Sequence, residues 1–216
     1  MGRASADTWR LSSASGSATL HATLFLRDAF QLKPDDEPGI PPLLRGDVPD
    51  FSALVSNLDE REAAQSWTSW FERALSVELD VLTESQTMSV DAARAQFFDP
   101  PGFASLAGSP ALRVLAQSSH REALRWSKYH SSLTSDSLRH ALRDSVVAPV
   151  AWGTCAARHV SPARLRASVL VLDVEGLWTS FPRAGVVACS VAVVRKAAHL
   201  QECLREAFVQ NLEATP

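Results

Sequence analysis

The stretch that decides the fold is Ala167–Val194, which reads ASVLVLDVEGLW over 167–178, TSFPRAG over 179–185 and VVACSVAVV over 186–194. Its two outer parts are rich in β-branched residues, and the middle part holds Pro182 and Gly185. Such runs on either side of a proline- and glycine-containing segment predict a β-hairpin, with 168–178 antiparallel to 186–195. Because valine occupies both faces of each run, we expect these strands to be covered on both faces or central in their sheet.

The N-terminal region predicts further strands. Trp9 and Leu11 are compatible with a short strand, whereas the small polar residues around them predict a mobile tail over residues 1–16. Thr19–Leu26 alternates, with leucine or alanine at 20, 22, 24 and 26, which is the period of a half-buried strand. If these strands pair with the C-terminal hairpin, one antiparallel sheet results.

Helices fill the middle of the chain. The helix expected after Asp59 has the strongest pattern, because Trp67, Trp70 and Phe71 repeat at spacings of three and four residues. Further N-terminal signals occur at Ser89, at Ser109-Pro110 and at Thr134 or Ser135, with Pro149 as the end of that last helix. A final helix is expected over 196–212. Five prolines over 33–49 predict a surface loop without regular structure.

These elements predict the α+β class: an antiparallel sheet from N-terminal strands and a C-terminal β-hairpin, covered by a central group of helices and a C-terminal helix. With 216 residues, 46% apolar and 21% charged, the chain is long enough for one sizeable core. We therefore expect a single α+β domain over 17–216, with the proline-rich loop at 33–49.

Composition limits the environment and the partners. The formal net charge of −3 gives no general attraction to nucleic acid or anionic lipid. Cys155, Cys189 and Cys203 form no Cys-x-x-Cys pair, and this usage favours a reducing compartment. Neither a signal peptide nor a membrane span is predicted, and only three of the 21 basic residues are lysine, a bias typical of GC-rich bacterial genomes. The expected location is therefore a bacterial cytoplasm.

One group of residues is a candidate binding site. Asp173 and Glu175 lie two residues apart in a predicted strand, so their carboxylates share a face and could hold a metal or exchange protons. Trp152, His159 and Trp178 flank the connector and the hairpin, where the edge of a pocket or a partner surface is possible. No complete catalytic set, metal-ligand spacing or phosphate-binding glycine loop is present, so no catalytic residue, metal or cofactor is predicted. His130, beside Trp126 in an apolar stripe, is interpreted as a histidine at the edge of the core.

A second motif lies just before the hairpin. Residues 154–165 resemble the middle of a helix-turn-helix motif, with Ser161-Pro162 at the start of the recognition helix and Arg158, Arg164 and Arg166 as a basic surface. Two features depart from that motif: His159 stands where glycine is usual, and the β pattern begins by Ala167. Pro162–Arg166 therefore predicts one short turn that connects to the strand.

Three functions follow, from different classes. The preferred hypothesis is a non-enzymatic interaction or assembly domain, which self-associates or binds another protein, because six tryptophans accompany a good core without a catalytic set. The first alternative is an enzyme or small-molecule-binding protein with a site near Trp152, His159, Asp173 and Glu175. The second alternative is a DNA-binding regulator that uses the basic surface, although nucleic acid is not the expected partner.

Overall fold

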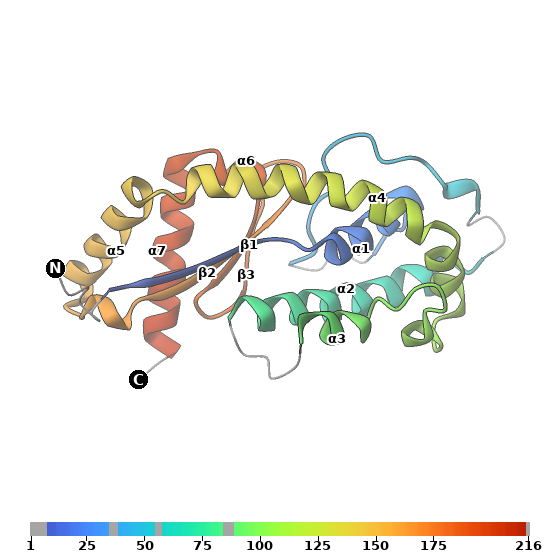
Figure 1. The fold of residues 1–216 in the computed structure, drawn as a ribbon, viewed down its shortest axis with the longest axis horizontal. Helices are drawn as coiled ribbons and strands as arrows, with labels where there is room; N and C mark the ends of the chain where they lie inside the picture. The colour runs from blue at the N-terminus through green and yellow to red at the C-terminus, as the bar shows by residue number, and fades with distance from the viewer. Residues whose placement is uncertain (1–7, 35–38, 55–57, 84–88, 215–216) are drawn as a thin grey trace. The chain divides into compact units, whose positions relative to one another are not determined.

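The computed structural model describes residues 8–34, 39–54, 58–83 and 89–214, and its fold is α+β, as predicted (Figure 1). The strands are β1 (Arg10–Ser15), β2 (Arg166–Leu172), β3 (Thr179–Arg183) and β4 (Val186–Ser190). The helices are α1 (Ala18–Ala29), α2 (Glu60–Leu82), α3 (Val90–Ala95), α4 (Pro110–Ala141), α5 (Asp144–Arg158), α6 (Val191–Val194) and α7 (Ala197–Ala214). Single 3-10 turns occupy Ser52–Leu54, Ala104–Leu106 and Pro162–Arg164.

The chain divides into two compact units. The sheet unit comprises 1–15, 134–172 and 176–216, and the helical unit comprises 16–133 and 173–175. The single domain expected over 17–216 stays a prediction.

The sheet of the sheet unit has the strand order β1-β2-β4-β3. β2 pairs in parallel with both β1 and β4, with Ser15 opposite Val171 on one side and Val171 opposite Cys189 on the other. Every residue of β2 after Arg166 is buried, which agrees with its expected central position. The sheet is therefore mixed rather than antiparallel throughout.

The hairpin exists, but its first strand is not the predicted one. β3 pairs antiparallel with β4, whereas the predicted strand beginning at Ser168 is β2, which pairs parallel to β4. The physical reason is the tight turn at Gly185 (φ 77°), which requires a strand immediately before it. Pro182 is tolerated there because β3 is an edge strand whose register shifts between Ser180 and Arg183.

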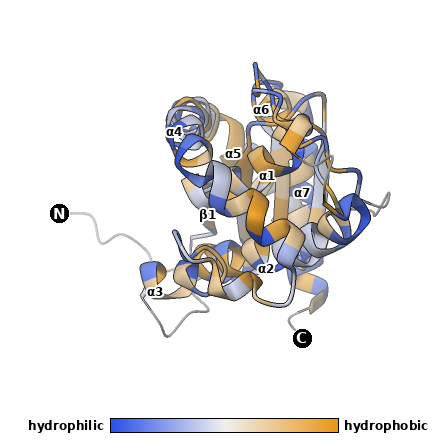
Figure 2. Cartoon of the chain, turned by 90° about the vertical axis from the view of Figure 1, so that its right-hand side faces the viewer, coloured by the Kyte–Doolittle hydropathy of each residue, from blue (hydrophilic) through white to orange (hydrophobic). Residues whose placement is uncertain are grey.

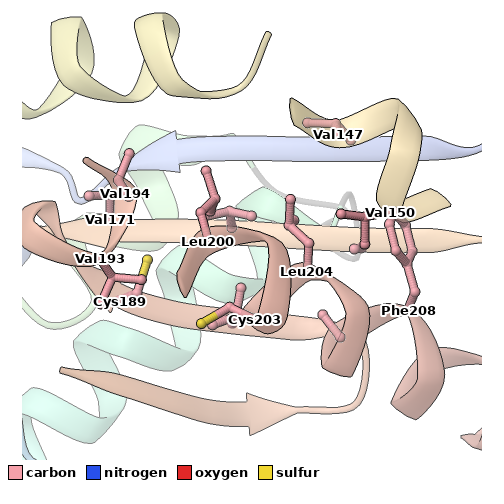
Figure 3. Close-up of a cluster of buried hydrophobic side chains, with 14 of the residues drawn as sticks. Val147, Val150, Val171, Cys189, Val193, Val194, Leu200, Cys203, Leu204 and Phe208 are labelled. Atoms are coloured by element: carbon pink, nitrogen blue, oxygen red, sulfur yellow. The ribbon is translucent and has the colours of Figure 1, made fainter. Parts of the chain in front are cut away.

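The core of the sheet unit is aliphatic. α7 packs on β2, β4 and α5, and Figure 3 shows Leu200, Leu204 and Phe208 in one cluster with Val171 of the sheet. α7 begins and ends within two residues of the helix expected over 196–212. Pro162–Arg164 is a single turn that leads into β2, as predicted.

The helical unit corrects the strand predicted over Thr19–Leu26, because this segment is α1. Ser17 caps α1 by accepting a hydrogen bond from the N–H of Leu20 at 3.0 Å. His21, Thr23 and Phe25, which the predicted strand would place on its less buried face, are all buried, so the helix is enclosed on nearly every side. A helix that is buried all round shows no 3.6-residue pattern, and its alternation in sequence was therefore misleading.

α2 follows the prediction: Asp59 caps it, and Trp67, Trp70 and Phe71 are buried. Figure 2 shows that α2 carries both hydrophobic and hydrophilic residues, as expected for a helix with one buried face. α3 begins after Ser89 and α4 at Pro110, also as predicted.

Two predicted helix boundaries are wrong. No new helix begins at Thr134 or Ser135, because no glycine or proline interrupts 111–141 and α4 continues to Ala141. Pro149 does not end a helix but lies inside α5. It is exposed there, so water can reach the carbonyl group that loses its N–H partner.

Candidate functional site

Asp173 is the centre of a polar cluster in the helical unit. The residue comes directly after β2, and its side chain is fully buried. Arg45 Nε donates to Oδ1 at 2.9 Å, and His130 Nδ1 lies 2.7 Å from Oδ2. The backbone N–H of Asp173 donates to His21 Nε2 at 3.2 Å. One buried carboxylate thus has a guanidinium and an imidazole as partners, and a second imidazole holds its backbone.

His21 is a neutral group that positions this cluster. Its Nδ1 lies 3.0 Å from the carbonyl oxygen of Gly16 and 3.1 Å from that of Ser17, so the ring proton is on Nδ1 and Nε2 accepts from Asp173. Burial lowers the pKa of His21, and the hydrogen bond to the Ser17 carbonyl opposes this shift only in part. No pattern in the sequence indicated a role for His21, because its segment was predicted as a strand.

His130 occupies the more accessible end of the cluster, with a side chain that is 13% exposed. Its ring stacks on Trp126, with centroids 3.7 Å apart and planes inclined by 13°. Gly46 makes room for it, because a Cβ at this glycine would lie 3.2 Å from His130 Cε1, and its φ of 103° also favours glycine. The interpretation of His130 as a histidine at the edge of the core did not include its carboxylate partner.

The cluster also fastens the proline-rich loop. The N–H of Arg45 donates to the Asp173 carbonyl at 2.9 Å, and the N–H of Glu175 donates to the Leu43 carbonyl at 2.8 Å. These bonds frame an antiparallel bridge between Leu44 and Val174. No helix or strand lies in the described part of 33–49, as predicted, but Leu44 is buried rather than at the surface.

The arrangement is compatible with two roles, one chemical and one structural. A carboxylate on Nδ1 of an imidazole sets its tautomer and orients the ring for proton transfer at Nε2. The same contacts also stabilise a folded loop without any chemistry. In the part of the chain that the structure describes, no group of three His, Cys, Asp or Glu side chains is arranged to hold a metal ion.

The residues predicted for a binding site are not gathered in one unit. Asp173 and Glu175 belong to the helical unit, where the former is buried and the latter exposed. Trp152, His159 and Trp178 belong to the sheet unit. Among described residues, no hydrogen bond, ion pair or ring contact joins these three, and His159 ends α5 with a φ of 53°.

The basic residues lie at and beyond the end of α5. Arg158, Arg164 and Arg166 are exposed, and Arg158 lies 3.5 Å from Glu213. Arg164 closes the single 3-10 turn, and Arg166 already belongs to β2. This segment contains no helix of the two to three turns that a major groove accommodates.

The exposed face of α5 is unusual in carrying no charge. Pro149, Trp152, Gly153 and Ala156 are all exposed, and their spacing of three, one and three residues places them on one face. No charged residue occurs over 145–157. Trp152 is 55% exposed, although tryptophan is normally well buried. We refer to these four residues as the α5 face.

The cysteines are buried free thiols. Burial raises the pKa of Cys189 far above its usual range, so this thiol stays protonated and unreactive at neutral pH. Within the described ranges, no helix has the length and apolar character that a membrane span requires.

No protein-family model, curated protein or solved structure matches this chain.

Proposed function

We propose that this chain is a non-enzymatic interaction domain that assembles with a second copy of itself through the α5 face. The observation that carries the proposal is an exposed helix face with a tryptophan at its centre and no charge along it. Exposed helix faces normally carry charged residues, whereas tryptophan is enriched among the residues that dominate binding energy.

The shape of the face supports a second copy as the partner. In an antiparallel pair of α5 helices related by a two-fold axis, Trp152 of one copy lies opposite Gly153 of the other. The same register places Pro149 opposite Ala156. A large side chain therefore meets a position without a side chain, and the two-fold axis repeats this contact, so the face is complementary to itself. α5 has 15 residues and is about 22 Å long, so it provides only part of a standard interface and we expect weak association.

The proposal is tested by sedimentation velocity over a range of concentrations, with Trp152→Ser compared to Leu177→Ser. Leu177 is the matched control, because it is an exposed apolar residue of the same unit outside the α5 face. We expect the mass to rise with concentration for the wild type and for Leu177→Ser, but not for Trp152→Ser. A photo-crosslinking residue at 152 should also capture a second copy. A wild type that stays monomeric would contradict the self-assembly proposal, and capture of a different protein would point to a heterologous partner.

The contact between Asp173 and His130 favours a second candidate function, an enzyme or small-molecule-binding protein that transfers a proton at His130. A panel of ester and phosphoester substrates tests it, with His130→Gln as the variant. Activity in the wild type that disappears in a folded His130→Gln protein would support this candidate. Equal turnover by both proteins would contradict it. The DNA-binding alternative has less support, because Pro162–Arg164 forms only one turn.

A further inference from the structure

The sheet unit contains a pocket that the proposed function does not use. Its volume is about 600 Å³, within the range of small-molecule sites. It lies where α4 ends, where α5 and α7 begin, and beside Val194 of α6. None of the four residues of the α5 face lines it.

Two arginines, Arg143 and Arg195, lie on the wall of the pocket. Within the described part of the chain, neither Arg143 nor Arg195 forms an ion pair. The one carboxylate in the lining, that of Asp136, already lies 3.3 Å from Arg139. Arg195 is oriented by a hydrogen bond of 3.3 Å to Ser137 Oγ, which also lines the pocket. The wall therefore offers two guanidinium groups to an anion.

His140 adds a neutral donor. Arg143 Nη2 lies 2.7 Å from His140 Nδ1, and a guanidinium can only donate, so Nδ1 accepts and the proton of the neutral ring is on Nε2. The ring thus carries one N–H donor on the side away from Arg143. A donor of this kind suits carboxylate or phosphate oxygens without requiring the imidazole to be charged.

The beginnings of two helices reinforce the preference for an anion. α5 has Arg143 at its N-cap and no side chain that caps it, and Ser145 and Val146 of its first turn line the pocket. In α7 the N–H of Leu200 bonds to the Lys196 carbonyl, so Ala197 precedes the hydrogen-bond ladder and lines the pocket too. Free N–H groups and the positive end of the helix dipole stabilise negative charge.

The rest of the lining is apolar. The accessible part comes from Ala141, Val146 and Ala197, which are partly or fully exposed, whereas Val194 and Leu200 are buried in the core cluster beneath it. An inorganic ion would leave this apolar surface uncovered. We propose that the pocket binds an amphipathic organic anion, with a carboxylate or phosphate head on Arg143 and Arg195 and an apolar body on the side chains of Ala141, Val146 and Ala197.

Isothermal titration calorimetry on the full chain tests the proposal with four probes: decanoate, decyl phosphate, decanol and inorganic phosphate. We expect one-to-one binding of decanoate or decyl phosphate, and the tighter of the two identifies the head group. Decanol and inorganic phosphate should bind at least about tenfold more weakly, because each lacks one half of the recognised chemistry. Equal binding of decanol and decanoate, or no binding of either anion, would overturn the proposal.

Variants locate the ligand. Arg143→Gln and Arg195→Gln should each weaken binding of the preferred anion about tenfold or more. Arg205→Gln is the matched control: it removes the same charge from the sheet unit, but Arg205 lies in α7 and does not line the pocket. All three arginines are exposed, so the variants should fold, which circular dichroism confirms. A loss of affinity in Arg205→Gln as large as in the other two would show general charge attraction and overturn the site. The α5 face is intact in these variants, so a loss of anion binding can be told apart from a loss of self-association.

Discussion

The two units bury different kinds of side chains. The core cluster of the sheet unit consists of aliphatic side chains, cysteines and Phe208, and its buried polar groups are hydroxyls such as that of Ser190. The helical unit buries aromatic rings together with ionisable groups: among described residues, His21, Arg27, Glu78 and Asp173 are buried, and all four lie there. Apolar burial depends on area and little on pH, whereas buried charges depend on each partner. A substitution or a change of pH should therefore change the stability of the two units by different amounts.

The hydrogen bonds of the helical unit show how specific its core is. Trp67 Nε1 donates to the Thr23 carbonyl at 2.7 Å, and Trp70 Nε1 donates to the Phe97 carbonyl at 2.6 Å. Glu78 accepts from Arg94 at 2.8 and 3.0 Å, and this ion pair raises the pKa of Arg94. Each of these groups would lose a buried hydrogen-bond partner if the neighbouring residue were substituted. The helical unit should therefore tolerate substitutions less well than an aliphatic core does.

The largest expected effect is that of Trp70→Ala. Trp70 is 2% exposed and stacks on Phe98 with ring centroids 6.0 Å apart, so truncation leaves a large cavity. It also removes one of the two donors of the Phe97 carbonyl, which keeps its hydrogen bond from Ser105 Oγ at 3.1 Å. We expect the free energy of unfolding to fall by about 3–5 kcal/mol in urea denaturation. Hydrogen exchange should locate the loss in α2 before α7. A variant as stable as the wild type would show that this ring does not hold the core.

Local patterns in the sequence predicted the elements that depend on local chemistry. α2 and α7 have a clear apolar stripe, and the turn at Pro162 has its own capping signal. Two elements were missed: α1, whose burial on nearly every side removes any stripe, and β3, which is inserted at the sheet edge by a turn at Gly185. The boundary between α4 and α5 was also misplaced. Burial from all sides and strand order are tertiary properties, so no local window of sequence contains them.

The same limit applies to the candidate site. Asp173 was identified because it lies two residues from Glu175 in a predicted strand, which places both carboxylates on one face. Its partners His21, Arg45 and His130 are 152, 128 and 43 residues away in sequence, so only the tertiary fold brings them together. Trp152 was identified as a residue at the edge of a pocket or at a partner surface, and its exposure on an uncharged helix face is the observation on which the assembly proposal depends.

A smaller loss is expected for Asp173→Asn. The substitution removes the negative charge that Arg45 and His130 share, while the side chain keeps its size. Because Arg45 is 41% exposed and can be solvated by water, we expect a loss of about 2–3 kcal/mol rather than that of a fully buried pair. Glu175→Gln, an exposed neighbour, should change stability by about 0.5 kcal/mol or less. Equal effects in urea denaturation would show that the cluster does not stabilise the helical unit.

The next effect is a sensitivity of the helical unit to acid. The pKa of His21 is lowered in the folded protein, so below the ordinary value near 6.5 the unfolded chain binds a proton that the folded chain does not. Stability is therefore complete above this pH and falls as the pH drops, by at most about 1.4 kcal/mol per pH unit for one group. His21→Gln keeps a donor and an acceptor but does not titrate, and it should flatten the curve between pH 7 and 5. An unchanged slope would assign the acid sensitivity to other groups.

The stability of the sheet unit should fall at alkaline pH instead. The substitution that tests this has the smallest expected effect on stability at neutral pH. Burial raises the pKa of Cys189, so above the ordinary thiol value near 8.5 the unfolded chain releases a proton that the folded chain retains. Stability from this group is complete below that pH and falls as the pH rises. Cys189→Ala should lower stability by about 1 kcal/mol or less at pH 7, because only one sulfur atom is lost, yet it should flatten the decline between pH 8.5 and 10. The measurement is urea denaturation across this range, and Cys155→Ala is compared as a second buried thiol, whose pKa is raised by burial alone.

If the alkaline slope of Cys189→Ala equals that of the wild type, the core does not keep the Cys189 thiol protonated. The contrast between an acid-sensitive helical unit and an alkali-sensitive sheet unit would then be lost.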